Sequence, residues 1–284
     1  MTRTTKKAAA KLNTAIAGAV KRFAPPESLT VDEWADKHRR LSPESSAEAG
    51  PWRTKRTPYL EEPMRAFTDP KVHKIVMVAA SQVGKSELEL NIIGYIIDQD
   101  PGSILYVHPT IDDARKFSRL RVAPMIRDSK PLKAKVHDVK AKDSGNTILQ
   151  KSFPGGMLTL TGSNSASALA STPARYIIGD ERDRWATSAG TEGDPWALAE
   201  ARQATFYNAK ASRSPPDHQG NSNIETSFTK ARRNAGATAA PSVGSTARSC
   251  STISTSTRRP RGSAGKSRGA SRAASRGAAR PAAA

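Results

Sequence analysis

The chain has 284 residues, with 45 Lys and Arg against 26 Asp and Glu, a formal net charge of +19, 5% aromatic residues and one cysteine. One cysteine excludes a disulfide-stabilised scaffold and a zinc ribbon, because both need several cysteines at fixed spacings. The longest purely apolar run, Ile75–Ala80, is far shorter than the roughly 20 residues that cross a bilayer. We therefore expect a soluble, cytoplasmic chain with no membrane partner.

The positive charge is concentrated toward the C-terminus. Residues 231–284 contain eleven Lys and Arg and no acid, and consist otherwise mainly of Ala, Ser, Gly and Thr. Such a segment cannot bury enough apolar surface to offset the entropy of ordering the chain. We predict a disordered basic tail over 231–284, a folded domain over 28–230 and a basic N-terminal arm over 1–27.

Between these ends, strand and helix patterns alternate. Helices are expected, in chain order, at 30–40, 58–68, 85–98, 111–127 with a kink near Pro124, 166–170 and 194–205. Strands are expected at 72–79, 103–107, 147–153, 157–161 and 175–179, the third and fourth forming a pair joined through 154–156. This alternation predicts an α/β fold with a mainly parallel sheet flanked by helices, which binds ligands at the carboxyl ends of its strands.

The first chemical motif lies between the strand at 72–79 and the helix at 85–98. It reads Ala79-Ala80-Ser81-Gln82-Val83-Gly84-Lys85-Ser86, the layout of a P-loop in which Ala79 replaces the first glycine. In a P-loop, backbone N–H groups face the phosphates, the Lys neutralises β/γ oxygens and the Ser hydroxyl binds Mg²⁺. The alternative is an ordinary surface turn. We predict an ATP site formed by Gln82, Val83, Gly84, Lys85 and Ser86.

The second motif is Arg175-Tyr176-Ile177-Ile178-Gly179-Asp180-Glu181, an apolar strand that ends in two acids. This is the pattern of a Walker B strand. Asp180 would then hold Mg²⁺, and Glu181 would polarise the attacking water as the general base. The alternative is a strand end with two solvated acids. Lys85 and Glu181 are the predicted catalytic residues, and Ser86 and Asp180 the predicted metal ligands.

Other candidates are less specific. Tyr59 could stack on adenine near Arg53 or Gln82, although an aromatic residue at a helix start more often packs in the core. The arginines that could contact phosphates are Arg119, Arg121, Arg184 and Arg202. The histidines without metal-ligand spacing, which we interpret as structural, are His73, His108 and His137.

With both motifs in place, residues 28–230 resemble the ATPase domain of the terminase large subunit of tailed bacteriophages, in the lambda-like, GpA-type group. The resemblance includes residues 81–86, Leu105-Tyr106-Val107-His108-Pro109-Thr110, 161–165, 180–185, 192–195 and 202–206. It implies an additional-strand, RecA-like P-loop NTPase that hydrolyses ATP to package viral DNA into a procapsid. It also implies action as a homo-oligomer in the host cytoplasm, on double-stranded DNA, with a small terminase subunit and the portal.

Two departures from the family affect this interpretation. The family usually has an apolar residue where Arg182 stands. A Ser-Pro-Thr-type motif that couples hydrolysis to movement should also follow the next apolar strand, but residues 209–220 show no buried-strand pattern. This predicts a damaged strand and impaired hydrolysis. One hypothesis is that 209–220 and 231–284 are translated out of frame and that the family's endonuclease domain is absent.

Two other functions remain open on the sequence alone. Another P-loop DNA translocase or helicase would share both motifs. A non-enzymatic nucleic-acid-binding fragment would use mainly the basic tail, which can bind phosphates nonspecifically through counterion release.

Overall fold

The computed structural model describes residues 27–46, 48–77, 83–136 and 146–214. The predicted tail at 231–284 and nearly all of the predicted arm at 1–27 lie outside these ranges. Within the described ranges, no helix is both long enough and apolar enough to cross a membrane.

All the helices except α7, which the sequence analysis did not predict, lie close to their predicted positions. They are α2 Val31–His38, α3 Glu61–Thr68, α4 Lys85–Asp98, α5 Ile111–Phe117, α6 Ala123–Asp128, α7 Lys130–Lys135, α8 Ala166–Ser171 and α9 Pro195–Ala201. Short 3₁₀ turns occupy Thr54–Arg56, Pro58–Leu60 and Arg182–Arg184, and a π-helical turn occupies Ser118–Val122. The helix expected at 111–127 is thus α5, the π turn and α6 in succession. The π turn ends just before Pro124, whose missing N–H removes a regular helical hydrogen bond.

The strands form one large sheet and one small ribbon. The strands are β1 Arg40–Leu41, β2 Gly50–Pro51, β3 Lys74–Val76, β4 Ile104–His108, β5 Gln150–Phe153, β6 Gly156–Gly162, β7 Tyr176–Gly179 and β8 Lys210–Arg213. The six-stranded sheet has the order β3-β8-β7-β4-β6-β5, in which only β5 is antiparallel to its neighbour. The predicted α/β fold with a mainly parallel sheet is confirmed.

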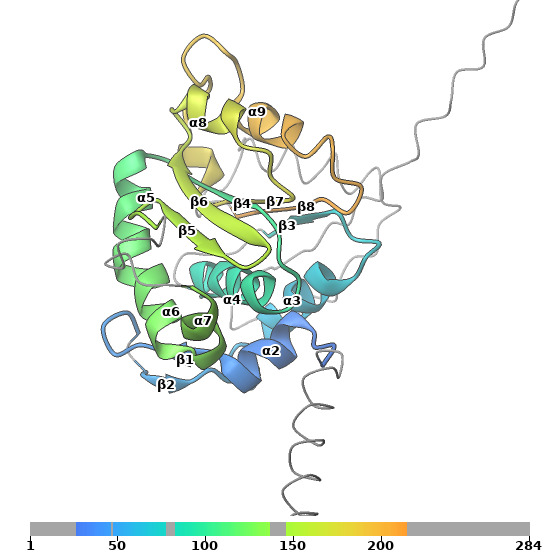
Figure 1. Cartoon of the computed structure of the whole chain (residues 1–284), viewed down its shortest axis with the longest axis vertical. Helices are drawn as coiled ribbons and strands as arrows, with labels where there is room; N and C mark the ends of the chain where they lie inside the picture. The colour runs from blue at the N-terminus through green and yellow to red at the C-terminus, as the bar shows by residue number, and fades with distance from the viewer. Residues whose placement is uncertain (1–26, 47, 78–82, 137–145, 215–284) are drawn as a thin grey trace, which may run out of the picture.

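Helices cover both faces of the sheet. In Figure 1, α3 and α4 lie on one side of the strands, and α8 and α9 lie on the other. Strand β4 shows how the sequence builds both layers, because its side chains alternate between the faces. Ile104 and Tyr106 join the core cluster on the α4 side, whereas Leu105 and Val107 join the cluster on the α9 side.

The prediction that residues 209–220 contain no buried strand is wrong. Strand β8 pairs in parallel with both β3 and β7, so it is an interior strand of the sheet. Its polar side chains are buried with partners: the Lys210 Nζ donates to the backbone carbonyls of Asp69 at 2.6 Å and Val72 at 2.9 Å. Burial lowers the pKa of Lys210 to about 8. The strand is hidden in the sequence because three of its four residues, Lys210, Ser212 and Arg213, are polar.

Helix α4 packs very closely against α2. A Cβ atom at Gly94 would lie 2.2 Å from the Cη2 of Trp34, a side chain with no exposed surface. The Trp34 indole is also fixed by a 2.8 Å hydrogen bond from Nε1 to Asp98. The close approach of the two helices therefore requires glycine at position 94.

We expect Gly94→Ala to lower the free energy of unfolding by about 1–3 kcal/mol, because the added methyl group overpacks a rigid interface. Chemical denaturation of the single variant measures this cost. In the Trp34→Leu background the same substitution should cost much less, since the smaller side chain leaves room for the methyl group. An equal cost in both backgrounds would contradict the steric explanation.

Candidate functional site

The carboxyl ends of four neighbouring parallel strands meet at one edge of the sheet. The described part of the P-loop follows β3, Ser214 follows β8, Asp180 follows β7, and His108 is the last residue of β4. Because parallel strands all end at the same edge, residues far apart in the sequence become neighbours there. The sequence predicted this convergence for the P-loop and Asp180, but not for Ser214.

The end of the predicted P-loop is formed by Gly84 and the first turn of α4. Gly84 has a φ of +85°, a left-handed conformation that glycine adopts without steric cost, and it is the N-cap of the 14-residue helix. Val83, Lys85 and Ser86 adjoin it and are all half-buried. The helix N-terminus presents backbone N–H groups that suit an anion. Gln82 lies outside the described residues.

Asp180 is enclosed at the end of β7. Its side chain is 13% exposed, with the His108 Nδ1 3.8 Å from Oδ2 and the Ser214 Oγ 3.2 Å from Oδ1. Burial raises the pKa of Asp180 to about 6, with a further contribution from the charge of Glu181, while Ser214 and Lys85 act in the opposite direction. The positive charge of Lys85 is near enough to act on the Asp180 carboxyl, so the two predicted motifs lie at the same edge of the sheet.

Glu181 has a different environment from its neighbour. Its side chain is 38% exposed, and its Oε2 accepts a 2.6 Å hydrogen bond from Nη1 of Arg184. It is also the only non-glycine among the described residues with a positive φ, +46°. The two adjacent acids are thus separated into one enclosed carboxylate and one more open carboxylate.

Arg182, the residue that departs from the family pattern, is accommodated by its neighbours. Its Nη2 lies 3.1 Å from both carboxylate oxygens of Asp194, and its guanidinium lies about 6 Å from the ring centroids of Trp185 and Trp196. An arginine can occupy this position because its charge is paired and its planar group packs against aromatic rings.

A cavity of about 270 Å³ adjoins the start of α4. Tyr59, Arg53, Val83 and Gly84 are among its lining residues. Tyr59 also packs against the hydrophobic core, as the packing interpretation of this residue expects, and its stacking on adenine stays a prediction. The sequence-based grouping of Tyr59 with Arg53 next to the P-loop is matched by their position around one cavity.

The four arginine candidates have different surroundings. Arg184 contacts Glu181, whereas Arg202 donates to the carbonyl of Ala170 at 2.7 Å. Arg121 forms a 2.7 Å ion pair with Glu87 in α4, and Arg119 is exposed on the π turn. Of the four, Arg184 lies beside the acidic pair.

Sequence analysis did not place three residues in the site. His108 and Ser214 adjoin Asp180, and Glu89 is connected to it through the Ser214 hydroxyl. Two signals were available. Glu89 stands four residues after Lys85, which places it on the same face of α4. Ser214 precedes a proline, as the first residue of the family's coupling motif does.

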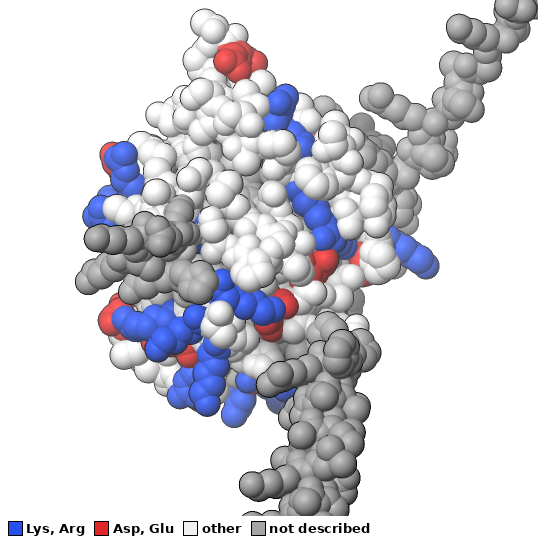
Figure 2. Space-filling model, viewed as in Figure 1, with Lys and Arg blue, Asp and Glu red and all other residues white. Residues whose placement is uncertain are grey.

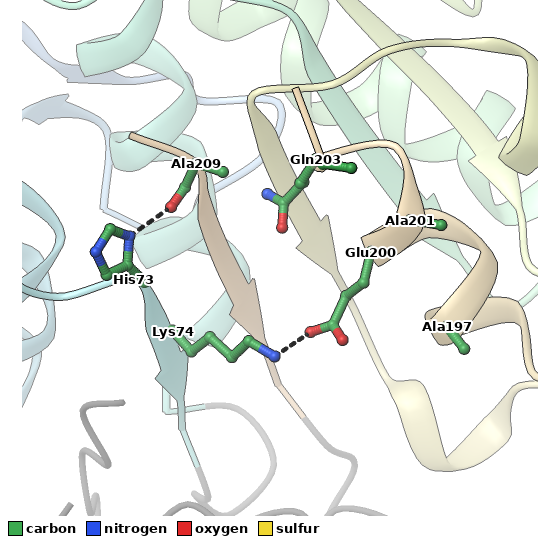
Figure 3. Close-up of a pocket in the computed structure, with 8 residues that line it drawn as sticks. His73, Lys74, Ala197, Glu200, Ala201, Gln203 and Ala209 are labelled. Atoms are coloured by element: carbon green, nitrogen blue, oxygen red, sulfur yellow. Dashed lines mark hydrogen bonds and ion pairs between the residues drawn. The ribbon is translucent and has the colours of Figure 1, made fainter. Parts of the chain in front are cut away.

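A larger cavity of about 420 Å³ lies at the opposite edge of the sheet, beside the amino ends of β3 and β8 (Figure 3). Its polar side chains bind one another or the backbone. Lys74 pairs with Glu200 at 2.8 Å, the His73 Nδ1 lies 3.1 Å from the Ala209 carbonyl, and Gln203 donates to two backbone carbonyls. These groups hold α9 against the sheet, so this cavity is not the candidate site.

The donor atoms at the carboxyl edge fit Mg²⁺. No cluster of three or more His, Cys, Asp and Glu suited to a metal ion occurs in the described part of the chain. Mg²⁺ does not need such a cluster, because it commonly keeps several waters and takes one or two protein oxygens together with phosphate oxygens. The Ser86 hydroxyl and the enclosed Asp180 carboxylate are oxygen donors of that kind.

The strand-to-helix turn at Gly84, the acid pair at the end of β7 and the parallel sheet between them define a P-loop NTPase domain. The family model described as "Phage terminase large subunit gpA, ATPase domain" matches residues 46–235, and the chain belongs to this family.

Individual relatives agree with this assignment. The terminase large subunit of Escherichia phage lambda is 28% identical over 202 residues, and that of Enterobacteria phage P21 is 26% identical over 202 residues. Each match covers 70% of this chain and 31% of the relative, so the chain spans about a third of the length of these proteins. The crystal structure of the HK97 bacteriophage large terminase has the same fold, with a TM-score of 0.54 and 14% identity over 72% of this chain and 42% of that one.

His108 should remain neutral at physiological pH. Burial lowers its pKa to about 4, and its ring packs against those of Tyr106 and Phe117, with centroids 4.5 and 4.8 Å away. We expect its ring resonances in NMR, assigned by their loss in His108→Gln, to keep the chemical shifts of a neutral imidazole from pH 8 to about 5.5, with only a small change as the neighbouring Asp180 titrates near pH 6. The unfolded chain takes up this proton near pH 6.5, so His108 makes stability fall as pH decreases from about 6.5 toward 4. A midpoint near 6.5 in the folded protein would contradict this description.

Proposed function

We propose that the chain binds Mg·ATP at the carboxyl edge of its sheet and hydrolyses it as the motor domain of a DNA-packaging terminase. The observation that carries this proposal is that the N-terminus of α4, with Lys85, and the end of β7, with Asp180, lie at the same carboxyl edge of the sheet, where the charge of Lys85 acts on Asp180. Family membership supports ATPase activity in general. The remaining assignments follow from the positions of individual side chains.

The first part of the proposal concerns the phosphates. Backbone N–H groups at the start of α4, after Gly84, face the phosphate oxygens, and Lys85 offsets their negative charge. Ser86 and Asp180 hold Mg²⁺, which when bound neutralises charge on the β- and γ-phosphate oxygens. The cavity beside Gly84 takes the adenine, with Tyr59 stacking on the base.

The second part concerns hydrolysis. Glu181 is the general base, because its carboxylate is more open than that of Asp180 and can receive a proton from water. Arg184 holds this carboxylate in place through its 2.6 Å hydrogen bond. Strand β8 is an interior strand, so the impairment expected from a missing strand has no basis in the described residues.

The third part concerns partners. We propose that the chain acts on double-stranded DNA as a homo-oligomer in the host cytoplasm, with a small terminase subunit and the procapsid portal. Basic side chains gather over the α6, α7 and β1 region of the face in Figure 2, and Lys130 and Lys133 of α7 are exposed. A surface of this charge attracts the phosphates of a duplex.

Two substitutions test the proposed site directly. We expect Lys85→Ala to weaken ATP binding by about 10–150-fold, because it removes a charge-assisted contact worth roughly 1.5–3 kcal/mol. Glu181→Gln should retain binding but lower the hydrolysis rate by about 10²–10⁴-fold, because the amide cannot accept the proton. Calorimetry and phosphate release measure the two effects, with the exposed Lys116→Ala as the matched control. Equal binding and turnover by Lys85→Ala and Lys116→Ala would remove the support for the proposal.

The same phosphate-release assay separates a packaging motor from a helicase. Stimulation by duplex DNA is expected of a packaging motor, whereas stimulation by single-stranded DNA alone would favour the helicase alternative. DNA binding without ATP turnover under any of these conditions would favour a non-enzymatic nucleic-acid-binding fragment.

The adenine assignment is tested at Tyr59. We expect Tyr59→Leu to weaken ATP binding by roughly 5–150-fold, since stacking of an aromatic ring on a base contributes about 1–3 kcal/mol. Tyr59→Phe should bind ATP as the unsubstituted chain does, because it keeps the ring. Inorganic tripolyphosphate, which has no base, should bind both variants equally. A parallel loss of tripolyphosphate binding in Tyr59→Leu would show that Tyr59 acts on the fold instead.

A further inference from the structure

A buried carboxyl group that the proposed reaction does not use lies behind the site. Glu89 is in α4, one helical turn after Lys85, and is only 1% exposed. Its two oxygens have different partners. The Tyr106 hydroxyl donates to Oε2 at 2.5 Å, and the Ser214 Oγ lies 2.7 Å from Oε1.

Ser214 connects this carboxyl group to Asp180. Its Oγ also lies 3.2 Å from Asp180 Oδ1. Its backbone is fixed from both sides, because its N–H donates to the Gly179 carbonyl at 3.0 Å and its carbonyl accepts from the Arg182 N–H at 3.1 Å. The Ser214 hydroxyl is therefore held between two carboxyl groups, one from α4 and one from β7.

The number of available protons decides which hydrogen bonds can form among Glu89, Ser214 and Asp180. Ser214 has a single hydroxyl proton, which can point to Glu89 or to Asp180 but not to both. If Glu89 carried no proton, Ser214 would donate to it and would turn a lone pair toward the Asp180 carboxylate. With one proton on Glu89 Oε1, donation runs in one direction, from Glu89 to Ser214 and from Ser214 to Asp180.

The surroundings of Glu89 favour this neutral form. Burial raises the pKa of Glu89 well above its ordinary value, and the nearby charge of Asp180 acts in the same direction. Burial likewise raises the pKa of Tyr106 well above its ordinary value, so its phenol stays protonated and donates to the other oxygen of Glu89. Each hydrogen-bonding group in the series then has a partner of the required type.

We propose that Glu89 is a positioning residue of the nucleotide site, which acts through Ser214 to direct a hydroxyl proton at Asp180 and so fixes the carboxylate that would hold Mg²⁺. This inference rests on the proposed function, because Asp180 is a metal ligand only if the chain binds Mg·ATP. Groups that orient a metal ligand in this way commonly change metal affinity by about 10–100-fold when they are removed.

The first test uses two substitutions in the full chain. Glu89→Leu keeps much of the side-chain volume but removes both hydrogen bonds, whereas Glu89→Gln keeps an amide donor for Ser214 and a carbonyl acceptor for Tyr106. The probe is ATPγS, titrated with Mg²⁺ or with EDTA. We expect Glu89→Leu to lose about 10–100-fold in affinity for Mg·ATPγS while metal-free binding changes little, and Glu89→Gln to bind as the unsubstituted chain does. Equal losses in both variants would overturn the inference, because the negative charge would then be the property that matters.

A second variant keeps the test informative if Glu89→Leu is unstable. Ser214→Ala removes only the bridging hydroxyl, and we expect it to cause the same Mg²⁺-dependent loss. Unchanged Mg²⁺ dependence in Ser214→Ala would overturn the inference.

Failure of this inference can be distinguished from failure of the proposed function. If the unsubstituted chain binds Mg·ATPγS, Lys85→Ala does not, and Glu89→Leu binds normally, the site is correct and only the role of Glu89 is wrong. If the unsubstituted chain and Lys85→Ala bind equally weakly, the proposed function fails and the inference fails with it.

Discussion

The insertion of β8 between β3 and β7 is the constraint on which the site depends. The Met77 N–H donates to the Arg213 carbonyl at 3.1 Å, and the Ser214 N–H donates to the Gly179 carbonyl at 3.0 Å. These two hydrogen bonds join the strand before the P-loop to the strand that ends at Asp180. Without β8, the two motifs would have no backbone connection across the sheet.

This interior strand is stabilised in an uncommon way for the centre of a sheet. It contains two cations, Lys210 and Arg213, where parallel strands usually have aliphatic residues. Burying a charge is costly unless it has partners. Lys210 has the carbonyls of Asp69 and Val72, and the Arg213 guanidinium lies 4.5 Å from the ring centroid of Trp196. Burial lowers the pKa of Arg213 to about 10, which reflects the cost of placing a cation there.

Much of the fold could be predicted because local signals and tertiary structure agree. Helix α4 has the predicted bounds, since Gly84 supplies a left-handed N-cap and the residues that follow are strongly apolar. Strand β8 could not be found by searching for alternating apolar residues, because most of its side chains are polar. The groups that stabilise Lys210 and Arg213 in the interior lie far away in the sequence. Arg182 was an anomaly for the same reason: Asp194 and two tryptophans become its neighbours only after folding.

The candidate site also contains residues that the sequence reveals and others that only the folded structure reveals. Lys85, Ser86 and Asp180 stand in contiguous motifs, which a single sequence reveals. Glu89 looks like an ordinary polar residue of a helix until the sheet brings Tyr106 and Ser214 against it. A buried network is therefore assembled from residues that are individually uninformative, and only its three-dimensional arrangement indicates a role.

The backbone at Glu181 implies a conflict between stability and function. A φ of +46° is uncommon for a residue with a side chain, and holding one in such a conformation costs on the order of 1 kcal/mol or more. Glycine would relieve that cost but has no carboxylate. Selection for thermal stability alone would therefore favour loss of the acid, whereas selection for turnover would retain it. With Glu181 as the proposed base, the presence of an acid at this strained position indicates that selection for turnover outweighed selection for stability.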